Sequence, residues 1–180
     1  MIAQDKSSTV IHTIQPVWNS ESEILILGTM PSPASRNAGF FYMHPQNRFW
    51  KVLEAVFDEK LCFPNNSPDT ASAIEERKNF LLRHHIALWD VLSECKINGA
   101  SDSSIKNAKA NDFTRILEQS KIHRVFCTGK TAFMLWQKHC AEIYEIRFNL
   151  ESHCLPSTSP ANAAWSLDKL IGAYSVLRLC

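Results

Sequence analysis

Four consecutive aliphatic residues at 24–27, followed by Gly28, constrain the fold more than any other part of the sequence. A strand that is covered on both faces shows no apolar–polar alternation, so this run predicts a fully buried strand of a parallel sheet. Gly28 lets the chain turn sharply as it leaves the sheet, and Pro31 prevents the strand from continuing. Open α/β sheets bind ligands at the carboxyl ends of their strands. We therefore expect the functional site directly after Gly28.

Segments with strand and helix patterns alternate along the rest of the chain. The sequence predicts strands over residues 23–27, 86–92, 125–127 and 146–150, and helices over 45–57, 73–84, 112–119, 131–143 and 163–177. Loops are expected around Pro33 and Gly39 and over residues 62–70, 96–109 and 155–162. This alternation indicates an α/β fold: a three-layer α/β/α sandwich with a mainly parallel four-stranded central sheet.

Size and charge exclude several classes of protein. The 180 residues fit a single domain, assigned to residues 1–180 with an N-terminal arm at 1–21. The net charge of +1 excludes a histone-like protein that binds nucleic acid by charge alone. No apolar run approaches the ~20 residues of a membrane span, and the amino terminus shows no leader pattern. We expect a cytoplasmic monomer that does not bind membranes.

The cysteines give no sign of a metal site. The chain has six cysteines, at positions 62, 95, 127, 140, 154 and 180. They stand far apart, and no two of them form a Cys-x-x-Cys pair. His139-Cys140 and His153-Cys154 could be combined into a metal site, but scattered thiols in ordinary core positions fit the spacing better. We predict no metal and no cofactor.

Two stretches carry a family resemblance. Residues 28–32 (Gly-Thr-Met-Pro-Ser) and 41–52 (Phe-Tyr-Met-His-Pro-Gln-Asn-Arg-Phe-Trp-Lys-Val) resemble the first motif of the uracil-DNA glycosylase superfamily. The nearest matches are its mismatch-specific uracil and hypoxanthine (deoxyinosine) branches. They share the Gly-x-x-Pro turn, a similar spacer, an aromatic residue that stacks on the extruded base and a His-Pro-x-Asn-x-Phe-Trp run. The resemblance implies the same α/β architecture and a base-excision enzyme.

Asn47 is the predicted catalytic residue, just inside the helix that follows Pro45. Hydrolysis of an N-glycosidic bond needs an oriented water, which an amide can hold through its carbonyl group while its amino group donates. The alternative is a helix-start asparagine that satisfies backbone groups. Relatives have Asp or Asn at Met30 and histidine at Leu155. These departures favour hypoxanthine over uracil, or an inactive protein.

The predicted base-binding residues are Met30, Phe41, Tyr42, Asp90 and Thr128. Tyr42 lies twelve residues after Met30, at the spacing of the relatives' stacking aromatic. The alternative for Tyr42 and Phe41 is a core position under the loop. Asp90 lies in a buried apolar strand and needs a partner, so it either reads a purine edge, positions the sugar or caps a neighbouring loop. Thr128 replaces the asparagine that commonly ends this strand in the hypoxanthine branch.

The segment 155–162 resembles the second superfamily motif, which enters the minor groove. Small hydroxyls and amides suit phosphate contacts, although a plain turn is the alternative from composition alone. The predicted DNA-binding residues are Ser32, His44, Lys130, Pro156, Ser157, Thr158, Ser159 and Asn162. Thr128-Gly129-Lys130-Thr131 is not a P-loop because Arg124 stands where that motif needs glycine. The helix that starts there could still offer its amino terminus to a phosphate.

These observations predict a metal-free, monofunctional DNA glycosylase that acts on damaged DNA, with double-stranded DNA as the first expected form and single-stranded DNA as the second. Hypoxanthine is the first expected substrate and uracil the second. No lysine occupies a matched catalytic position, so strand cleavage through a Schiff base is not expected. One alternative is a degenerate protein of the same fold that binds lesions or nucleic acid without chemistry. A weaker one is a nucleoside-processing or nucleotide-binding α/β enzyme.

Overall fold

The computed structural model describes residues 8–179, so the predicted arm is seen only from Ser8 onward. The strands are β1 (Ser8–Ile11), β2 (Ile24–Gly28), β3 (Ile86–Asp90), β4 (Leu92–Asn98), β5 (Ser101–Ala110), β6 (Arg124–Thr128) and β7 (Glu151–Leu155). The α-helices are α1 (Pro33–Ala38), α2 (Phe49–Phe57), α3 (Thr70–Arg83), α4 (Thr114–Glu118), α5 (Lys130–Trp136), α6 (Glu142–Phe148) and α7 (Leu167–Tyr174). A π-helical turn, Gln137–Ala141, joins α5 to α6, and a 3₁₀ turn, Ser175–Leu179, follows α7.

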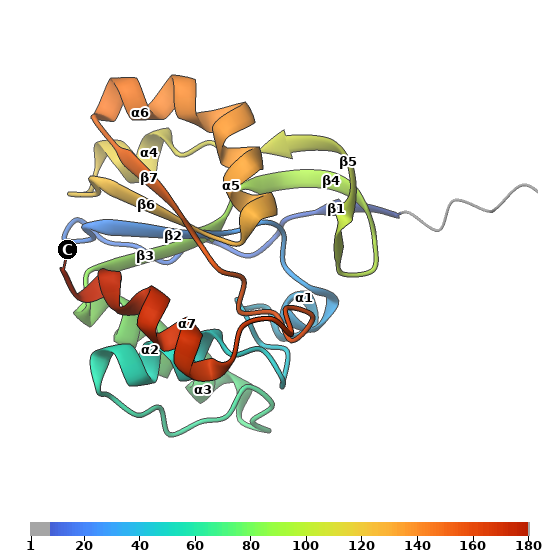
Figure 1. The fold of residues 1–180 in the computed structure, drawn as a ribbon, viewed down its shortest axis with the longest axis vertical. Coiled ribbons are helices and arrows are strands. Elements are labelled where there is room, and N and C mark those ends of the chain that lie inside the picture. The colour runs from blue at the N-terminus through green and yellow to red at the C-terminus, as the bar shows by residue number, and fades with distance from the viewer. Residues whose placement is uncertain (1–7, 180) are drawn as a thin grey trace, which may run out of the picture.

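The central sheet has four parallel strands in the order β3-β2-β6-β7, which confirms the predicted α/β/α fold (Figure 1). β2 lies inside the sheet, where Ile24 pairs with Ile86 on one side and Arg124 on the other. Every residue of β2 is buried, as its continuous apolar run predicts.

Each face of the sheet packs against its own group of helices. Leu25 and Leu27 point into a core shared with α5 and α6, whereas Ile24 and Ile26 point into a second core shared with α2 and α7. Successive side chains of a strand face opposite ways, so the two cores lie on opposite faces. Figure 1 shows α4, α5 and α6 on one face of the sheet and α2, α3 and α7 on the other.

A second, antiparallel sheet was not predicted. Its order is β1-β4-β5, and β4 and β5 form a hairpin where the sequence predicts a loop over residues 96–109. That prediction was wrong because β5 (SDSSIKNAKA) is mostly polar and only partly buried. The predicted strand over 86–92 also divides at Val91, because β3 ends at Asp90 and β4 begins at Leu92.

Other predicted boundaries also need correction. The strand expected over residues 146–150 is wrong, because α6 continues to Phe148 and β7 follows it. The final helix begins at Leu167 rather than at 163. A short helix, α1, occupies the expected loop around Pro33, where the hydroxyl of Ser32 accepts a hydrogen bond from the Ser35 N–H.

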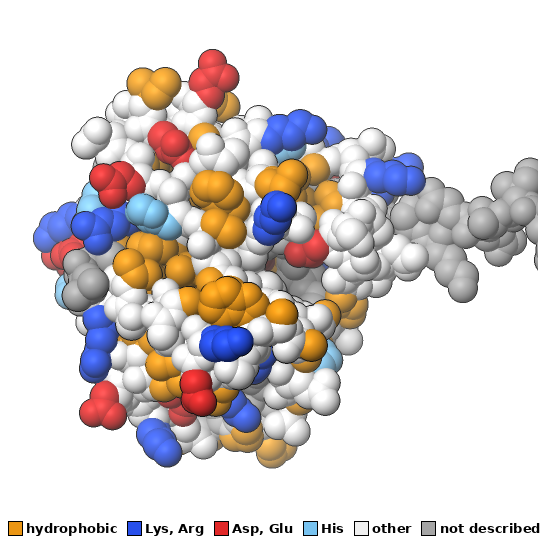
Figure 2. Space-filling view, viewed as in Figure 1, with side chains coloured by type: hydrophobic (Ala, Val, Ile, Leu, Met, Phe, Trp, Pro, Cys, Tyr) orange, Lys and Arg blue, Asp and Glu red, His pale blue; other side chains and the backbone are white. Residues whose placement is uncertain are grey.

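The surface drawn in Figure 2 carries basic and acidic side chains side by side, without a large area of one sign. Within residues 8–179, no helix is long and apolar enough to cross a bilayer. In the same part of the chain, no three His, Cys, Asp or Glu side chains are grouped so as to hold a metal ion.

Candidate active site

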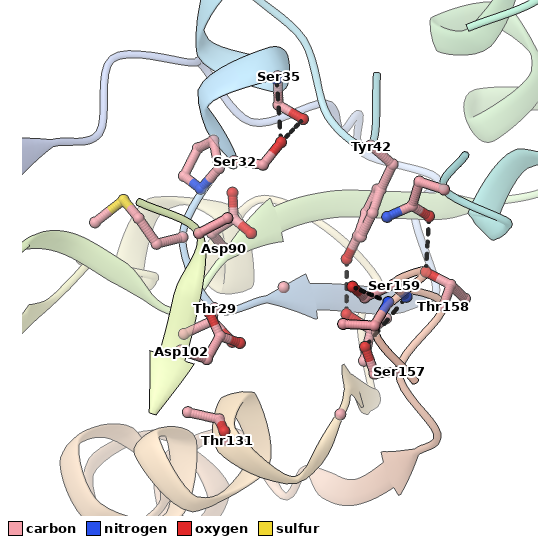
Figure 3. Close-up of a pocket in the computed structure, with 18 of the residues that line it drawn as sticks. Thr29, Ser32, Ser35, Tyr42, Asp90, Asp102, Thr131, Ser157, Thr158 and Ser159 are labelled. Carbon is pink, nitrogen blue, oxygen red and sulfur yellow. Dashed lines mark hydrogen bonds between the residues drawn. The ribbon is translucent and has the colours of Figure 1, made fainter. Parts of the chain in front are cut away.

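A cavity of about 510 Å³ opens at the carboxyl ends of β2, β3 and β6, where Gly28, Asp90 and Thr128 line it (Figure 3). Its volume lies in the range of small-molecule sites, ~300–1,000 Å³. The tip of the β4–β5 hairpin and the loop after β7 complete its walls. The position agrees with the expectation that the site follows Gly28.

One wall of the cavity is formed around Asn47. Its side-chain oxygen Oδ1 accepts from the Phe49 N–H at 2.9 Å and from the Thr158 hydroxyl at 3.0 Å. A carbonyl oxygen has two lone pairs, so both are engaged within the protein, and the oxygen is not free to hold a water as the sequence predicts. Within residues 8–179, Nδ2 is the group left for a ligand. The prediction that Asn47 lies inside the helix was wrong, since α2 begins at Phe49. The backbone contact weighed as an alternative is present, beside a cavity that Asn47 also lines.

Arg48 ties the loop after β7 to this wall. Its guanidinium group donates to four backbone carbonyls in the loop: Thr158 at 3.3 Å, Ser159 at 2.6 Å, Asn162 at 3.1 Å and Trp165. The Arg48 N–H also donates to the Thr158 carbonyl, at 3.2 Å. Thr158 is 1% exposed, so these contacts fix the hydroxyl that meets Asn47. We call Asn47, Arg48 and Thr158 the amide wall.

Tyr42 provides a flat surface. One ring face stacks on Phe49, with centroids 3.9 Å apart and planes 16° from parallel. Thr128 donates its only proton to the Leu27 carbonyl at 3.2 Å, so the Tyr42 hydroxyl donates to Thr128 at 2.7 Å. Burial, followed by the nearby charge of Asp90, raises the pKa of Tyr42 well above its ordinary value and keeps the phenol protonated. Tyr42 also lines the cavity, so the ring is placed to stack on a ligand.

A second wall carries Asp90. Its Oδ2 lies 2.8 Å from Nε2 of His12, and the two side chains are 5% and 1% exposed. The Phe41 and Trp89 rings pack against His12. A Cβ on Gly28 would lie 2.2 Å from Oδ1 of Asp90, so glycine there makes room for the carboxylate. The expected partner of Asp90 is therefore a histidine from the N-terminal segment.

Asp102, on β5, also belongs to this wall. The Thr29 hydroxyl donates to its Oδ2 at 2.9 Å, and Figure 3 shows the two side chains together, across the cavity from Tyr42. We call His12, Asp90, Thr29 and Asp102 the acid wall.

The other predicted site residues are placed as follows. Met30, Phe41, Ser32, Lys130, Ser157, Ser159 and Asn162 line the cavity. His44 and Pro156 do not line it. His44 instead accepts from the Gln46 N–H and Asn65 Nδ2, and the Pro156 carbonyl accepts from the Tyr174 hydroxyl.

Sequence reasoning missed His12, Arg48 and Asp102. Arg48 lies inside the quoted motif. Asp102 lies in the segment Asp-Ser-Ser-Ile, which resembles the hypoxanthine branch but was expected to be part of a loop without a site residue. His12 had no signal, because nothing in a short N-terminal arm indicates that it reaches the end of β3.

An α/β/α fold with a cavity at the carboxyl edge of its sheet, walled by a stacked aromatic ring and an asparagine, defines a DNA glycosylase. Residues 16–176 match the model of the uracil DNA glycosylase superfamily, and the chain belongs to this superfamily.

Curated relatives agree with this assignment. A Methanosarcina barkeri (strain Fusaro / DSM 804) protein named hypoxanthine DNA glycosylase is 35% identical over 116 residues, which are 64% of this chain and 68% of the relative. A protein of the same name from Methanosarcina acetivorans is 30% identical over 156 residues, 85% of this chain and 89% of the relative.

The fold is also similar to that of a solved structure. The solution NMR structure of a candidate uracil DNA glycosylase from Methanosarcina acetivorans matches with a TM-score of 0.72 and 26% identity. The match covers 95% of this chain and 99% of that one.

Proposed function

We propose that this protein removes hypoxanthine from DNA by hydrolysing its N-glycosidic bond, and that uracil is a second, poorer substrate. The observation that carries the proposal is the geometry of Asn47, whose oxygen is engaged on the protein side while its amino group is left for the cavity. The names of the two Methanosarcina relatives support the choice of hypoxanthine.

The extruded base stacks on the free face of Tyr42, which Phe49 supports from behind. Asp90 then accepts a hydrogen bond from the base through Oδ1. Deamination turns the acceptor N1 of adenine into the N1–H donor of hypoxanthine, and the acceptor N3 of cytosine into the N3–H donor of uracil. A carboxylate at this position therefore favours both deaminated bases over their parents.

Hydrolysis breaks the bond between C1′ and the base nitrogen, and the electron pair leaves with the base. The sugar gains oxocarbenium character and is attacked by water. The Nδ2 group of Asn47 donates to this water and holds it at the cavity. The water oxygen bonds to C1′, and the proton that this water loses balances the charge of the departing base. The products are the neutral free base and an abasic site, without strand cleavage.

The DNA contacts form around the rim of the cavity. Ser32, Lys130, Ser157, Ser159 and Asn162 are the rim residues proposed to meet phosphates. Thr158 is proposed to act through Asn47 because its hydroxyl is buried and engaged.

We also propose that the chain works as one domain and as a monomer on double-stranded DNA. Within residues 8–179 the cysteines at 62, 95, 127, 140 and 154 are free thiols, and the proposed location is the reducing cytoplasm.

The test compares wild type, Asn47→Ala and Asn47→Asp on duplexes with a single hypoxanthine, uracil or normal base. Aspartate keeps the oxygen that accepts from Phe49 and Thr158 but has no amino group, so it separates orientation from donation. We expect abasic product from wild type on hypoxanthine and a loss of roughly 10²-fold or more in both variants.

Full activity of Asn47→Asp would remove the amino group from the mechanism. Lesion-selective binding by wild type without abasic product would instead indicate a degenerate binder of the same fold.

A further inference from the structure

The proposed function leaves one partly buried carboxyl group of the cavity without a role. Asp102 reaches the cavity from β5, and Oδ2 accepts from the Thr29 hydroxyl at 2.9 Å. Among residues 8–179, Oδ1 of Asp102 has no hydrogen-bond partner, and the side chain forms no ion pair. A carboxyl group with one fixed oxygen and one free oxygen facing a ligand site is placed for proton transfer.

The two carboxylates of the acid wall have different surroundings. Asp90 has His12 as a partner at 2.8 Å, whereas Asp102 has only the Thr29 hydroxyl. Burial, and then the charge of Asp90, raises the pKa of Asp102, and the Thr29 hydrogen bond offsets part of this rise. Asp102 has no basic partner that would favour its charged form, so its burial beside a second carboxyl group favours the protonated form of Asp102.

Other titratable groups face this region from the neighbouring elements. They are His12 from the end of β1, Tyr42 from the loop before α2, Asp90 from β3, Cys95 from β4 and Lys130 from the start of α5. Tyr42 stays protonated, and burial raises the pKa of Cys95, so both remain neutral near pH 7. Lys130 is exposed at the rim.

We propose that Asp102 is the general acid that protonates the departing base at N7. This proposal rests on the glycosylase function proposed above. As the C1′–N9 bond breaks, its electron pair moves into the purine ring and the Asp102 proton is transferred to N7, so that the base leaves neutral. Water adds to C1′ and loses a proton, which restores the acid form of Asp102 over the cycle.

The two carboxyl groups of the acid wall complement the hydrogen-bonding edge of hypoxanthine. Hypoxanthine carries the N1–H donor and the N7 acceptor on either side of O6, so its edge needs one acceptor and one donor from the protein. Asp90 as a carboxylate and Asp102 as a carboxylic acid provide them. General acid catalysis contributes roughly 10²- to 10⁴-fold, which makes the assignment measurable.

The experiment pairs Asp102→Asn with a substrate that lacks the proton acceptor. Duplexes contain hypoxanthine or 7-deazahypoxanthine, in which N7 is replaced by C–H at nearly the same size. Wild type should prefer hypoxanthine by about 10²-fold or more, and Asp102→Asn should reduce this preference by at least about tenfold. The asparagine oxygen still accepts from Thr29, and a thermal melt checks the fold. Glu94→Gln, which removes a carboxylate paired with Lys109 on the same hairpin and outside the cavity, should keep the wild-type preference.

A second variant tests the proton itself. An acid works only while it is protonated, so the wild-type kcat should fall as the pH rises through the pKa of Asp102, and Asp102→Asn should lack this fall. The Thr29 hydrogen bond lowers that pKa, so Thr29→Val should move the fall to higher pH.

An unchanged preference in Asp102→Asn, or a falling limb that Thr29→Val does not move, would overturn the assignment of Asp102. Absence of any product from wild type on hypoxanthine would instead overturn the proposed function, so the two failures are distinct.

Discussion

The amide wall and the acid wall of the cavity are held in different ways. In the amide wall, Asn47 meets a backbone N–H and a hydroxyl, and the one charged member, Arg48, meets only backbone carbonyls. In the acid wall, each carboxylate is held by a single side chain from a distant part of the sequence, Asp90 by His12 and Asp102 by Thr29.

This difference separates two tasks. The Asn47 amide does not titrate, and the hydroxyl that holds it lies in a loop fixed by Arg48, so its geometry should not change with pH near neutrality, which suits the placing of a water. Carboxylates with single partners can differ in charge, which suits the reading of a base edge and the movement of a proton. Variants that disturb the amide wall should therefore affect activity differently from variants that disturb the acid wall.

The largest effect is expected from Gly28→Ala. The new Cβ would lie 2.2 Å from Oδ1 of Asp90 and 2.9 Å from the Tyr42 hydroxyl, and His12 restrains Asp90 from moving aside. Displacing the carboxylate that is proposed to contact the base should lower kcat/KM for hypoxanthine by roughly 10³-fold in single-lesion cleavage assays.

Gly172→Ala is the matched control for this variant. A Cβ there meets no atom within 4 Å, and alanine in a helix gains about 1 kcal/mol in stability over glycine. Equal activities of Gly28→Ala and Gly172→Ala would show that activity does not depend on the position of the Asp90 carboxylate.

Arg48→Lys disturbs the amide wall alone. Lysine keeps the charge but cannot reach four carbonyls with a planar fork, so the loop after β7 should loosen and Thr158 should hold Asn47 poorly. We expect kcat to fall by about 10²-fold with little change in KM, measured under single-turnover and steady-state conditions.

We expect Arg48 to influence the rate only by keeping Asn47 in position. In an Asn47→Ala background, Arg48→Lys should therefore add almost no further loss of rate. Losses that multiply in the double variant would mean that Arg48 acts independently of Asn47.

The smallest effect is expected from substitutions of Tyr42, which belongs to neither wall. Tyr42→Ala removes the stacking surface, worth ~1–3 kcal/mol per base, and should weaken binding of a hypoxanthine duplex in a fluorescence titration. Tyr42→Phe keeps the ring and loses one neutral hydrogen bond to Thr128, worth about 1 kcal/mol. If both variants bind equally weakly, the hydroxyl rather than the ring face determines binding.

The parts of the fold that the sequence predicts are those that local pattern determines. The apolar run of β2 fixes a buried strand, and its neighbours in the sheet follow from similar runs at β3 and β6. The β4–β5 hairpin could not be predicted in this way. The stability of β5 comes from pairing with β4 rather than from its own apolar residues, and register shifts interrupt that pairing.

The residues of the site also divide into those that local sequence patterns predict and those that they do not. Asn47, Tyr42 and Thr128 follow from motif spacing, and the structure brings all three to the cavity. Asp102 was missed as a site residue because it reaches Thr29, 73 positions earlier, only through the unpredicted hairpin. The Asp90 partner was missed because a contact across 78 positions leaves no local pattern.

The contact between His12 and Asp90 has a consequence for how much of the chain is needed for a working enzyme. The superfamily match begins at residue 16, so His12 lies outside the matched residues while its ring contacts a carboxylate that lines the cavity. A fragment trimmed to the matched residues would keep every motif and still bury an acid without its partner. Relatives with different leading segments could thus share their motifs and differ in the base they accept.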